Sequence, residues 1–279
     1  MSAIYLRYPG GKLKALTFSY DDGVETDKRL IDIFKKHGLK GTFNINSLLF
    51  APEGKVYPKG TVHRRMSKSQ CYETYKDSGM EVAIHGAEHL FWSEAPKDIT
   101  AFDILKDREL LEEMFGQVIR GGAYPYGDFN NDAVDALKTA GIVYCRAVQP
   151  TMDFRIPQDW LRLRPTCHHD EANLFALTEK FLGFTERGLH PYLFYVWGHS
   201  YEFDQKDNWD RIETFAEKVA HHDDVWYATN IEIYDYVEAY RRLHISLDGQ
   251  HIHNPSACPV WICAKGKIHE IPAGQTVNL

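Results

Sequence analysis

The chain has 279 residues, enough for one large domain or two small ones, and α/β barrels often fill this length alone. Its formal net charge of −7 argues against nucleic acid or an anionic membrane as the main partner, and no apolar run approaches the roughly 20 residues of a membrane span. The five cysteines are scattered without a CxxC pair, and the first residues lack the basic-then-apolar pattern of a secretory signal. We therefore expect reduced thiols and a cytoplasmic protein.

The first half of the chain alternates apolar β-type runs with helix-length segments. The run over residues 16–20 ends in Asp21, Asp22 and Gly23, and an apolar stripe with early acids and late bases predicts a helix over 26–38. The elements that follow are a strand over 41–46, a loop over 49–65, a helix over 67–77, a strand over 80–85, a helix over 96–115, a strand into 123–127, a helix over 131–140 and a strand over 142–146.

The second half continues the same alternation. Its elements are a period-two segment over 160–164, a helix over 171–182, a strand over 192–197, a helix over 208–220, a strand over 225–229 and a helix over 231–243. Strands separated by helices predict parallel pairing through right-handed crossovers. Seven or eight such units favour a (β/α) barrel over an open sheet, and no Gly-rich dinucleotide or P-loop fingerprint follows any strand.

From Ile245 onward the pattern changes to short strands joined by tight turns. Asp248-Gly249 and Lys265-Gly266 are typical of hairpin turns, so we expect a small antiparallel β appendage. The predicted division is a catalytic barrel over 1–244 and an appendage over 245–279 that packs on the barrel. A structural cover is favoured for it, with a sugar-binding or oligomerising role left open.

Two adjacent carboxylates end the first predicted strand. Burying Asp21 and Asp22 side by side is costly unless a cation or a proton resolves the repulsion. Successive side chains of a strand point to opposite sides, so one Asp could ligate a metal while the other accepts a proton. Taken alone, Asp-Asp-Gly is also ordinary turn chemistry.

Histidines follow two later strands, and in a barrel the carboxyl ends of strands carry the functional groups. His85 and His89 have the i, i+4 spacing that places two imidazoles one turn apart on a single side. With one Asp they would form a two-His, one-carboxylate site suited to Zn²⁺ and compatible with Fe²⁺, Co²⁺, Ni²⁺ or Mn²⁺. The alternative is two unrelated histidines among the 14 present.

The remaining chemistry needs a base and an acid. The Asp that does not bind the metal is the natural base for metal-bound water, and His199 is the favoured acid for the leaving group. Alternatively, His199 could be a third metal ligand or a histidine of the core. The metal and a backbone N–H near Tyr126 would stabilise the oxyanion.

Four motifs in this order resemble the NodB-homology polysaccharide deacetylases, carbohydrate esterase family four, over about residues 14–240. They are residues 17–23, His85 to His89, residues 123–127 and the segment ending in His199. The resemblance implies a distorted (β/α) barrel with Asp21 as base and His199 as acid. It also implies a metal bound by Asp22, His85 and His89, and an oxyanion contact from the backbone N–H of Tyr126.

Two positions depart from the family pattern. Ala123 stands where the family has an Arg that orients the catalytic Asp, and Arg146, Arg162 or Arg164 could replace it. Asp159-Trp160 matches the fourth motif only loosely, although Trp160 could line the pocket. Cys167-His168-His169 is unusual, with a role behind the site, in substrate binding or in packing left open. Aromatic residues that could stack on a sugar are Phe91, Trp92, Tyr124, Tyr126, Trp197 and Tyr201.

The sequence therefore favours a metal-dependent hydrolase that removes acetyl groups from an N- or O-acetylated oligo- or polysaccharide. A hydrolase of C–N bonds in small amides, imides or ureides is the alternative, and an inactive carbohydrate-binding barrel is a third reading. The expected partner is an acetylated carbohydrate or a small amide, with no nucleic acid and no membrane. The oligomeric state is left open.

Overall fold

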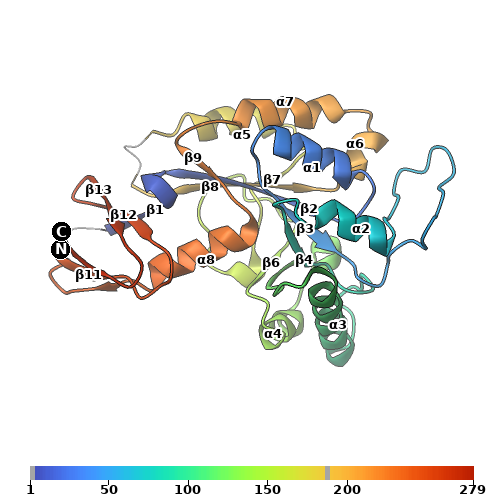
Figure 1. The fold of residues 1–279 in the computed structure, drawn as a ribbon, viewed down its shortest axis with the longest axis horizontal. Helices are drawn as coiled ribbons and strands as arrows, with labels where there is room; N and C mark the ends of the chain where they lie inside the picture. The colour runs from blue at the N-terminus through green and yellow to red at the C-terminus, as the bar shows by residue number, and fades with distance from the viewer. Residues whose placement is uncertain (1–3, 186–188) are drawn as a thin grey trace.

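A computed structural model describes residues 4–185 and 189–279, and a parallel β-sheet forms its centre (Figure 1). The strand order is β6 (Tyr144–Arg146), β5 (Gly121–Ala123), β4 (Glu81–Ile84), β3 (Thr42–Ile45), β2 (Lys14–Asp21), β8 (Tyr192–Gly198) and β7 (Cys167–His168). An eighth strand, β9 (Val225–Tyr227), pairs with the start of β2. Every pair in this sheet is parallel, as the strand–helix alternation predicts.

The two edges of the sheet approach each other through one irregular segment. Leu163 forms a parallel bridge to Arg146 of β6, and four residues later Cys167 pairs with Val196 of β8. The sheet is thus a curled, distorted barrel of the expected α/β class, without regular strands at its closure.

Eight α-helices in the described part of the chain cover this sheet. They are α1 (Asp27–Lys36), α2 (Lys68–Tyr75), α3 (Lys97–Phe115), α4 (Asn131–Thr139), α5 (Leu174–Leu182), α6 (Tyr201–Gln205), α7 (Trp209–Val219) and α8 (Asn230–Arg241). Capping boxes start α2 and α8, from Ser67 with Gln70 and from Thr229 with Glu232, and Gly116 in the left-handed conformation ends α3. In Figure 1, α1, α5 and α7 lie above the sheet and α3, α4 and α8 below it.

Two segments differ from the sequence expectation. The period-two segment around Trp160 is a 3-10 helix, Trp160–Arg162, whose first turn begins where the Asp159 carboxylate accepts from the Leu161 N–H at 3.0 Å. Local capping by Asp159 therefore outweighs the alternating pattern. The five-residue helix α6, directly after His199, is too short to produce a helical periodicity.

The core lies between the sheet and its helices. Strand β2 is buried along its whole length, and its Phe18 ring lies 4.5 Å from Phe34 of α1 and 5.8 Å from Phe215 of α7, between ring centres. Burying each such side chain contributes about 1.5–3 kcal/mol. Strand β2, which ends in Asp21, is therefore anchored by packing on both helices.

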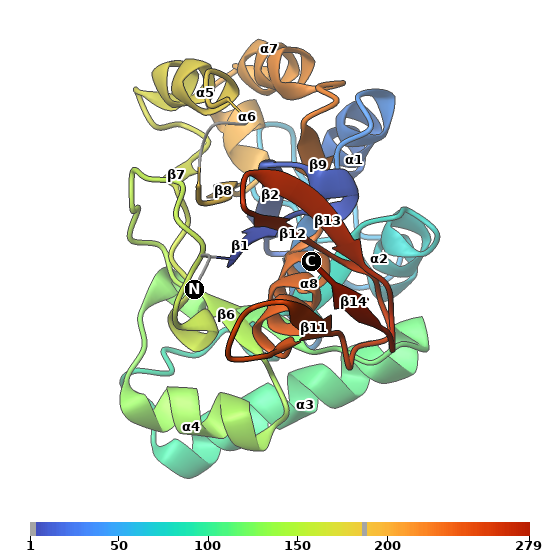
Figure 2. The same cartoon turned by 90° about the vertical axis from the view of Figure 1, so that its left-hand side faces the viewer.

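Two small antiparallel sheets lie at the end of the molecule that carries both termini (Figures 1 and 2). One contains β1 (Ile4–Arg7), β12 (Val260–Ala264) and β13 (Lys267–Ile271), and the other β10 (His244–Ile245), β11 (His251–His253) and β14 (Thr276–Asn278). The first strand of the chain therefore belongs to the same sheet as β12. The sheet contacts α8, where the Trp261 N–H donates to the Tyr236 hydroxyl at 2.9 Å. The predicted domain boundary at residue 244 stays a prediction. Strand β1 precedes this boundary, whereas β12 and β13 of the same sheet follow it.

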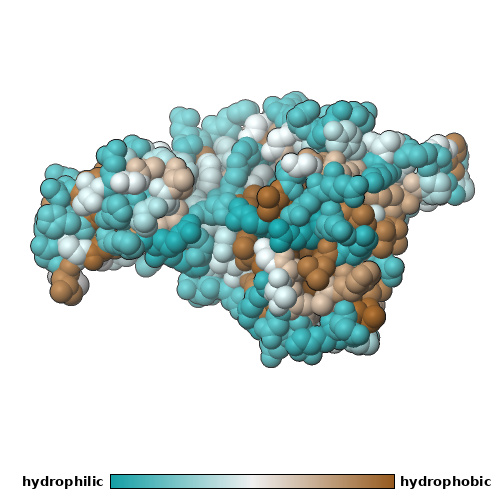
Figure 3. Space-filling model, turned by 60° about the horizontal axis from the view of Figure 1, so that its bottom comes forward, coloured by the Kyte–Doolittle hydropathy of each residue, from teal (hydrophilic) through white to brown (hydrophobic). Residues whose placement is uncertain are grey.

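The face of the molecule shown in Figure 3 is largely hydrophilic. In the face shown in Figure 3, apolar groups gather mostly in the right-hand part of the view, away from the end that carries the termini. Ile99, Phe102 and Leu105 of α3 are among the exposed apolar side chains. Among the described residues, no helix has both the length and the apolar character to cross a membrane.

Candidate active site

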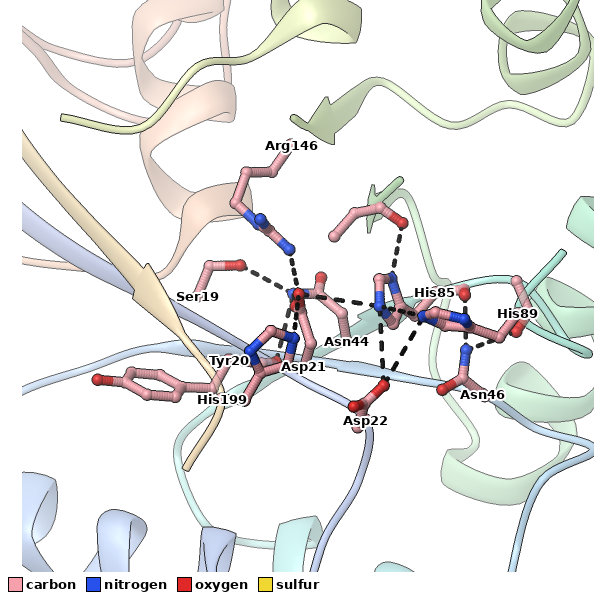
Figure 4. Close-up of polar contacts among 12 residues, drawn as sticks. Ser19, Tyr20, Asp21, Asp22, Asn44, Asn46, His85, His89, Arg146 and His199 are labelled. Carbon is pink, nitrogen blue, oxygen red and sulfur yellow. Dashed lines mark hydrogen bonds and ion pairs between the residues drawn. The ribbon is translucent and has the colours of Figure 1, made fainter. Parts of the chain in front are cut away.

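Polar side chains from four strands meet at the carboxyl edge of the parallel sheet (Figure 4). Asp21 is the last residue of β2 and Arg146 the last of β6, while His85 directly follows β4 and His199 directly follows β8. This is the convergence that the sequence predicts, because parallel strands end at a common rim.

Asp22, His85 and His89 form a cluster that could hold a metal ion. Their ligand atoms lie within 4.8 Å of one another. Asp22 Oδ1 is 3.9 Å from Nε2 of each histidine, and the two Nε2 atoms are 3.2 Å apart. Two imidazole nitrogens and one carboxylate oxygen directed to one point are a donor set that suits Zn²⁺ or a similar divalent ion.

The protonation of the two histidines fits this set. His85 Nδ1 lies 2.9 Å from the carbonyl oxygen of Ala123, to which it can donate, which leaves Nε2 as a free donor atom. Burial lowers the pKa of His85, and burial together with the charge of His85 lowers the pKa of His89 to about 4. Both rings are therefore neutral near pH 7, as metal ligands must be.

Asp22 is held by two residues of the loop between β3 and α2. Its Oδ2 lies 3.1 Å from His63 Nε2, and Arg65 donates to the Asp22 carbonyl at 2.8 Å. Arg65 also donates to Asn46 Oδ1 at 2.8 Å, and Asn46 donates to the His85 carbonyl at 2.6 Å. Burial opposes ionisation of Asp22, but the contact with His63 and the nearby cationic groups hold its pKa well below the usual range.

The backbone brings these groups together in a way that simple periodicity does not describe. Asp22 has φ of 83°, so the chain turns at the strand end and both Asp carboxylates face His85, rather than opposite sides. The two histidines are joined by a turn, not a helix, with the His89 N–H donating to the Gly86 carbonyl at 3.2 Å. Gly86 has φ of 75°, and a Cβ there would lie 2.7 Å from Asp103 Oδ2.

Two carboxylates of α3 support this turn from below. Asp107 accepts from the His85 N–H at 2.8 Å and from the Ser47 N–H at 2.9 Å. Asp103 accepts from the Glu88 N–H and from the Trp92 indole N–H, both at 2.8 Å. The loop that carries both histidines is therefore fixed by buried hydrogen bonds to one helix.

Asp21 forms a buried ion pair with Arg146, and neither side chain is more than 3% exposed. Asn44 donates to its other oxygen at 2.8 Å. Burial opposes ionisation, but Arg146, His85 and His199 outweigh it and lower the pKa of Asp21. Arg146 is paired in register with Ala123, so the arginine stands one strand away from the family position.

The other two arginines considered for this role lie elsewhere. Arg162 binds Asp159 and Asn131, and Arg164 donates to backbone carbonyls at Gln149 and Pro150. Trp160 donates its indole N–H to Glu238 of α8 and packs with Tyr234. Trp160 therefore packs against α8 and does not line the pocket, contrary to the expectation from the sequence.

His199 lies beside the Asp21–Arg146 pair, with Nε2 3.9 Å from Asp21 Oδ2. Its Nδ1 is 2.6 Å from Glu202 Oε1 on α6. Burial opposes the charged form, but this hydrogen bond and the carboxylates of the site raise the pKa of His199. A raised pKa keeps the imidazole protonated close to neutral pH, as a general acid requires.

The aromatic candidates divide by exposure. Tyr126, with φ of 59° and a half-exposed side chain, stacks on Phe91 with 3.5 Å between ring centres and lies 4.4 Å from the His89 ring. Trp197 contacts the Arg146 guanidinium at 4.4 Å from its ring centre. Tyr124 is fully buried and donates its hydroxyl to the Leu161 carbonyl, so its side chain cannot reach a substrate.

The two remaining aromatic candidates differ in their surroundings. Trp92 is buried and bonded to Asp103, so it too is packing material and not a stacking surface. The Tyr201 ring lies 5.2 Å from His199 and 4.9 Å from His63, beside the site.

Several residues of the site were not predicted from the sequence. His63 and Arg65 come from the loop between β3 and α2, which projects at the right of Figure 1. Asn44 lies in β3, the strand next to β2, and Asn46 directly follows it. Glu202 follows His199 by three residues, and this i, i+3 spacing was its only local signal.

A second group of ligating side chains lies behind His199. His168, His169, Asp170 and Glu202 place one ligand atom each within 4.8 Å of one another. The two histidines left open by the sequence are thus brought to Glu202, not to the metal-ligand candidates.

Comparison with known proteins supports the resemblance. Residues 5–145 match the sequence profile of a family described as polysaccharide deacetylase. No match was found among the curated proteins. A crystal structure of a putative polysaccharide deacetylase from Mycobacterium smegmatis is similar at 17% identity and a TM-score of 0.57, over 85% of this chain and 94% of that one.

Two further solved structures are more distant. The Streptococcus pyogenes deacetylase PplD, in complex with acetate, matches at 18% identity and a TM-score of 0.42, over 47% of this chain and 55% of that one. BA3943, described as a CE4 family pseudoenzyme from Bacillus anthracis, matches at 18% identity and a TM-score of 0.46, over 82% and 67%. This chain thus spans only about half of the streptococcal protein.

The profile match covers half of the chain, and the Mycobacterium structure has the same fold over most of its length. The chain belongs to the polysaccharide deacetylase family.

Proposed function

We propose that this protein is a metal-dependent hydrolase that removes acetyl groups from an N- or O-acetylated oligo- or polysaccharide. The observation that carries the proposal is the joint placement of the Asp22–His85–His89 donor set and the Asp21 and His199 pair at one rim. Family membership supports the substrate class.

In this proposal Asp22, His85 and His89 hold a divalent ion, with Zn²⁺ favoured. When bound, the ion supplies Lewis acidity that lowers the pKa of water and polarises the acetyl carbonyl. The donor set fits such an ion because both imidazoles are neutral and their Nε2 atoms face the carboxylate.

Asp21 is the proposed base. It is ionised through its pair with Arg146, so it can accept a proton from the attacking water. His199 is the proposed acid, which donates its Nε2 proton to the departing amine or alkoxide. The backbone N–H of Tyr126, a residue whose ring lies 4.4 Å from the His89 ring, is the proposed second oxyanion donor.

The test is acetate release by the zinc-loaded protein from chito-oligosaccharides and acetylated xylan, with and without a chelator, beside opening of cyclic imides. We expect chelator-sensitive acetate release. Asp21→Asn should lower turnover by about 10²–10⁴-fold and retain the metal, whereas His85→Ala should lose the metal. Metal content is measured by atomic absorption on the same samples.

Other outcomes would replace the proposal. Imide opening without acetate release would indicate a hydrolase of small C–N substrates. Sugar binding without any turnover would indicate an inactive carbohydrate-binding barrel. Full activity of Asp21→Asn would contradict the assignment of the base.

A further inference from the structure

One carboxylate, Glu202, faces three imidazoles. Its Oε1 lies 2.6 Å from His199 Nδ1 and 3.4 Å from His168 Nε2, and its Oε2 lies 3.3 Å from His169 Nε2. Glu202 sits on the first turn of α6, whereas His168 and His169 come from the end of β7. Two elements far apart in the sequence therefore meet on the residue that touches the proposed acid.

His169 is fixed in place by its packing. It is 1% exposed and stacks between Tyr20, at 5.7 Å, and Phe203, at 4.2 Å between ring centres. Residue 198 is glycine, and a Cβ there would lie 2.0 Å from His169 Nδ1. The ring cannot turn away from Glu202 without repacking its neighbours.

The tautomer of His168 is also set by its surroundings. The Asp170 N–H donates to His168 Nδ1 at 3.2 Å, so the proton of the neutral ring resides on Nε2, which points to Glu202. The two histidines thus place their Nε2 atoms beside the two oxygens of the same carboxylate.

The charges around this group are already balanced. Lys206 pairs with Asp170 and lies 3.5 Å from Glu202 Oε2, and Arg211 Nε lies 3.7 Å from Asp170 Oδ1. Two cationic side chains therefore accompany the two carboxylates. A further cation at this position would have to displace Lys206, so the group is better explained as a support for His199 than as a second metal site.

We propose that Glu202 is a positioning residue for His199, and that His168 and His169 hold Glu202 in the orientation that this requires. The inference rests on the proposed function of His199 as the acid. Accepting the Nδ1–H fixes the ring plane and leaves the proton to be donated on Nε2, the nitrogen 3.9 Å from Asp21. A carboxylate acceptor also stabilises the imidazolium form.

The effect on pH dependence follows from the groups that face His199. These are Asp21 at the end of β2 and Asp22 directly after it, Glu202 and Tyr201 from α6, Trp197 from β8, and His169, which follows β7. His63 and His168 lie one side chain further out, His63 against the Tyr201 ring and His168 against the Trp197 ring. Burial alone disfavours the charged ring, and the hydrogen bond to Glu202 reverses that. Without the carboxylate the active form should be lost at lower pH.

The kinetic test compares Glu202→Gln with Asp204→Asn in the zinc-loaded full chain. Asp204 is on the same helix but binds Arg64 and Trp209 instead of His199. We expect Glu202→Gln to lower kcat by about 10- to 100-fold with little change in KM, and to shift the upper pH limit of kcat downward. In Glu202→Asp the upper pH limit of kcat should move part of the way back toward the wild-type value. In Asp204→Asn it should be unchanged.

A second measurement does not depend on turnover. Proton NMR of the metal-free, substrate-free protein should show a downfield His199 Nδ1–H resonance that is lost in Glu202→Gln and weakened in His169→Gln. If the wild type had no acetate-releasing activity, this resonance would still support the positioning role while the proposed function failed. An unchanged resonance in Glu202→Gln would overturn the positioning role.

Metal titration provides the remaining check. We expect one tightly bound Zn²⁺ per chain, lost in His85→Ala and kept in the double variant His168→Gln, His169→Gln. A second equivalent that disappears in the double variant would overturn the inference in favour of a metal site at these histidines.

Discussion

Arg146 and Glu202 show how single residues complete the site from unexpected positions. Ala123 occupies the place of the arginine that the family resemblance requires, and the guanidinium instead comes from the neighbouring strand at the position paired with Ala123. The sequence supplied three candidate arginines but could not choose among them, because the choice depends on which strand lies next to β5. Asp21, Asp22, His85 and His199 were identifiable because they follow apolar runs, and His89 by its i, i+4 spacing from His85.

Asp27, the first residue of α1, shows the opposite electrostatic situation. It is fully buried and accepts hydrogen bonds from Tyr75 and Ser200, both at 2.5 Å. Burial outweighs these bonds and raises its pKa to about 7. Ser200 follows the proposed acid, so Asp27 also joins α1 to the corner between β8 and α6.

A raised carboxyl pKa predicts a stability that falls with pH. Between the unfolded pKa near 4 and the folded pKa near 7, the folded protein binds the extra proton, so its stability decreases as pH rises. Because asparagine does not titrate, Asp27→Asn should remove the contribution of this proton to the pH dependence of the free energy of unfolding. The change between pH 4 and 8 should be up to about 4 kcal/mol, at roughly 1.4 kcal/mol per pKa unit. Urea unfolding across this range measures the slope.

Glu81 and Asp107, whose pKa values are also raised to about 7, should keep a smaller slope in the Asp27→Asn variant. A slope identical to that of the wild type would mean that Asp27 does not hold its proton in the folded state.

At the scale of elements, alternation and capping predicted most of the helices and strands, because their signals are local. What failed was set by contacts distant in sequence or by very short segments. Leu163 bridges β6 where a regular strand was expected, and β7 has only two residues. The spacing of His85 and His89 correctly predicted that the two rings lie close together. The predicted helical turn was wrong, because a turn supported by α3 joins them instead.

The dependence of that turn on α3 gives a prediction for the whole element. Asp107→Ala would leave the buried Ser47 N–H without an acceptor, at about 1–3 kcal/mol, and the His85 N–H with only the Ile45 carbonyl at 3.1 Å. The loosened turn should also weaken metal binding by about 10- to 100-fold. Urea unfolding and zinc titration against a competing chelator measure the two effects.

Glu113→Ala is the matched control, since Glu113 is exposed on the same helix. If Asp107→Ala bound zinc as tightly as this control, the support from α3 would be irrelevant to the candidate metal site.

At the scale of the molecule, the small sheet is part of one packed structure. Ile262 of β12 is completely buried, in a cluster that includes Ala239 of α8 and Ile252 of β11, with Ile4 of β1 packed against it. These contacts join the predicted appendage to the last helix of the barrel and to the start of the chain. Sequence patterns predicted the hairpins but not the pairing of β1, which has no local signature.

This packing predicts cooperative unfolding. Ile262→Ala should lower the stability of the whole protein by about 2–5 kcal/mol in a single transition, because the cavity lies between α8 and the sheet. Ile268→Ala on neighbouring β13, where the side chain is 47% exposed, should cost much less. Circular dichroism and tryptophan fluorescence should report the same midpoint. A separate early transition that left the barrel folded would indicate an independent domain.

The pairing of β1 with β12 has a consequence for biosynthesis. Ile4 aligns with Ala264 and Arg7 with Trp261, so β1 leaves the ribosome long before the strand with which it pairs. During most of translation β1 has no partner and presents an open edge that other chains could join. Such long-range closure slows this folding step, so a nascent chain of this protein should depend on chaperones until β12 is released.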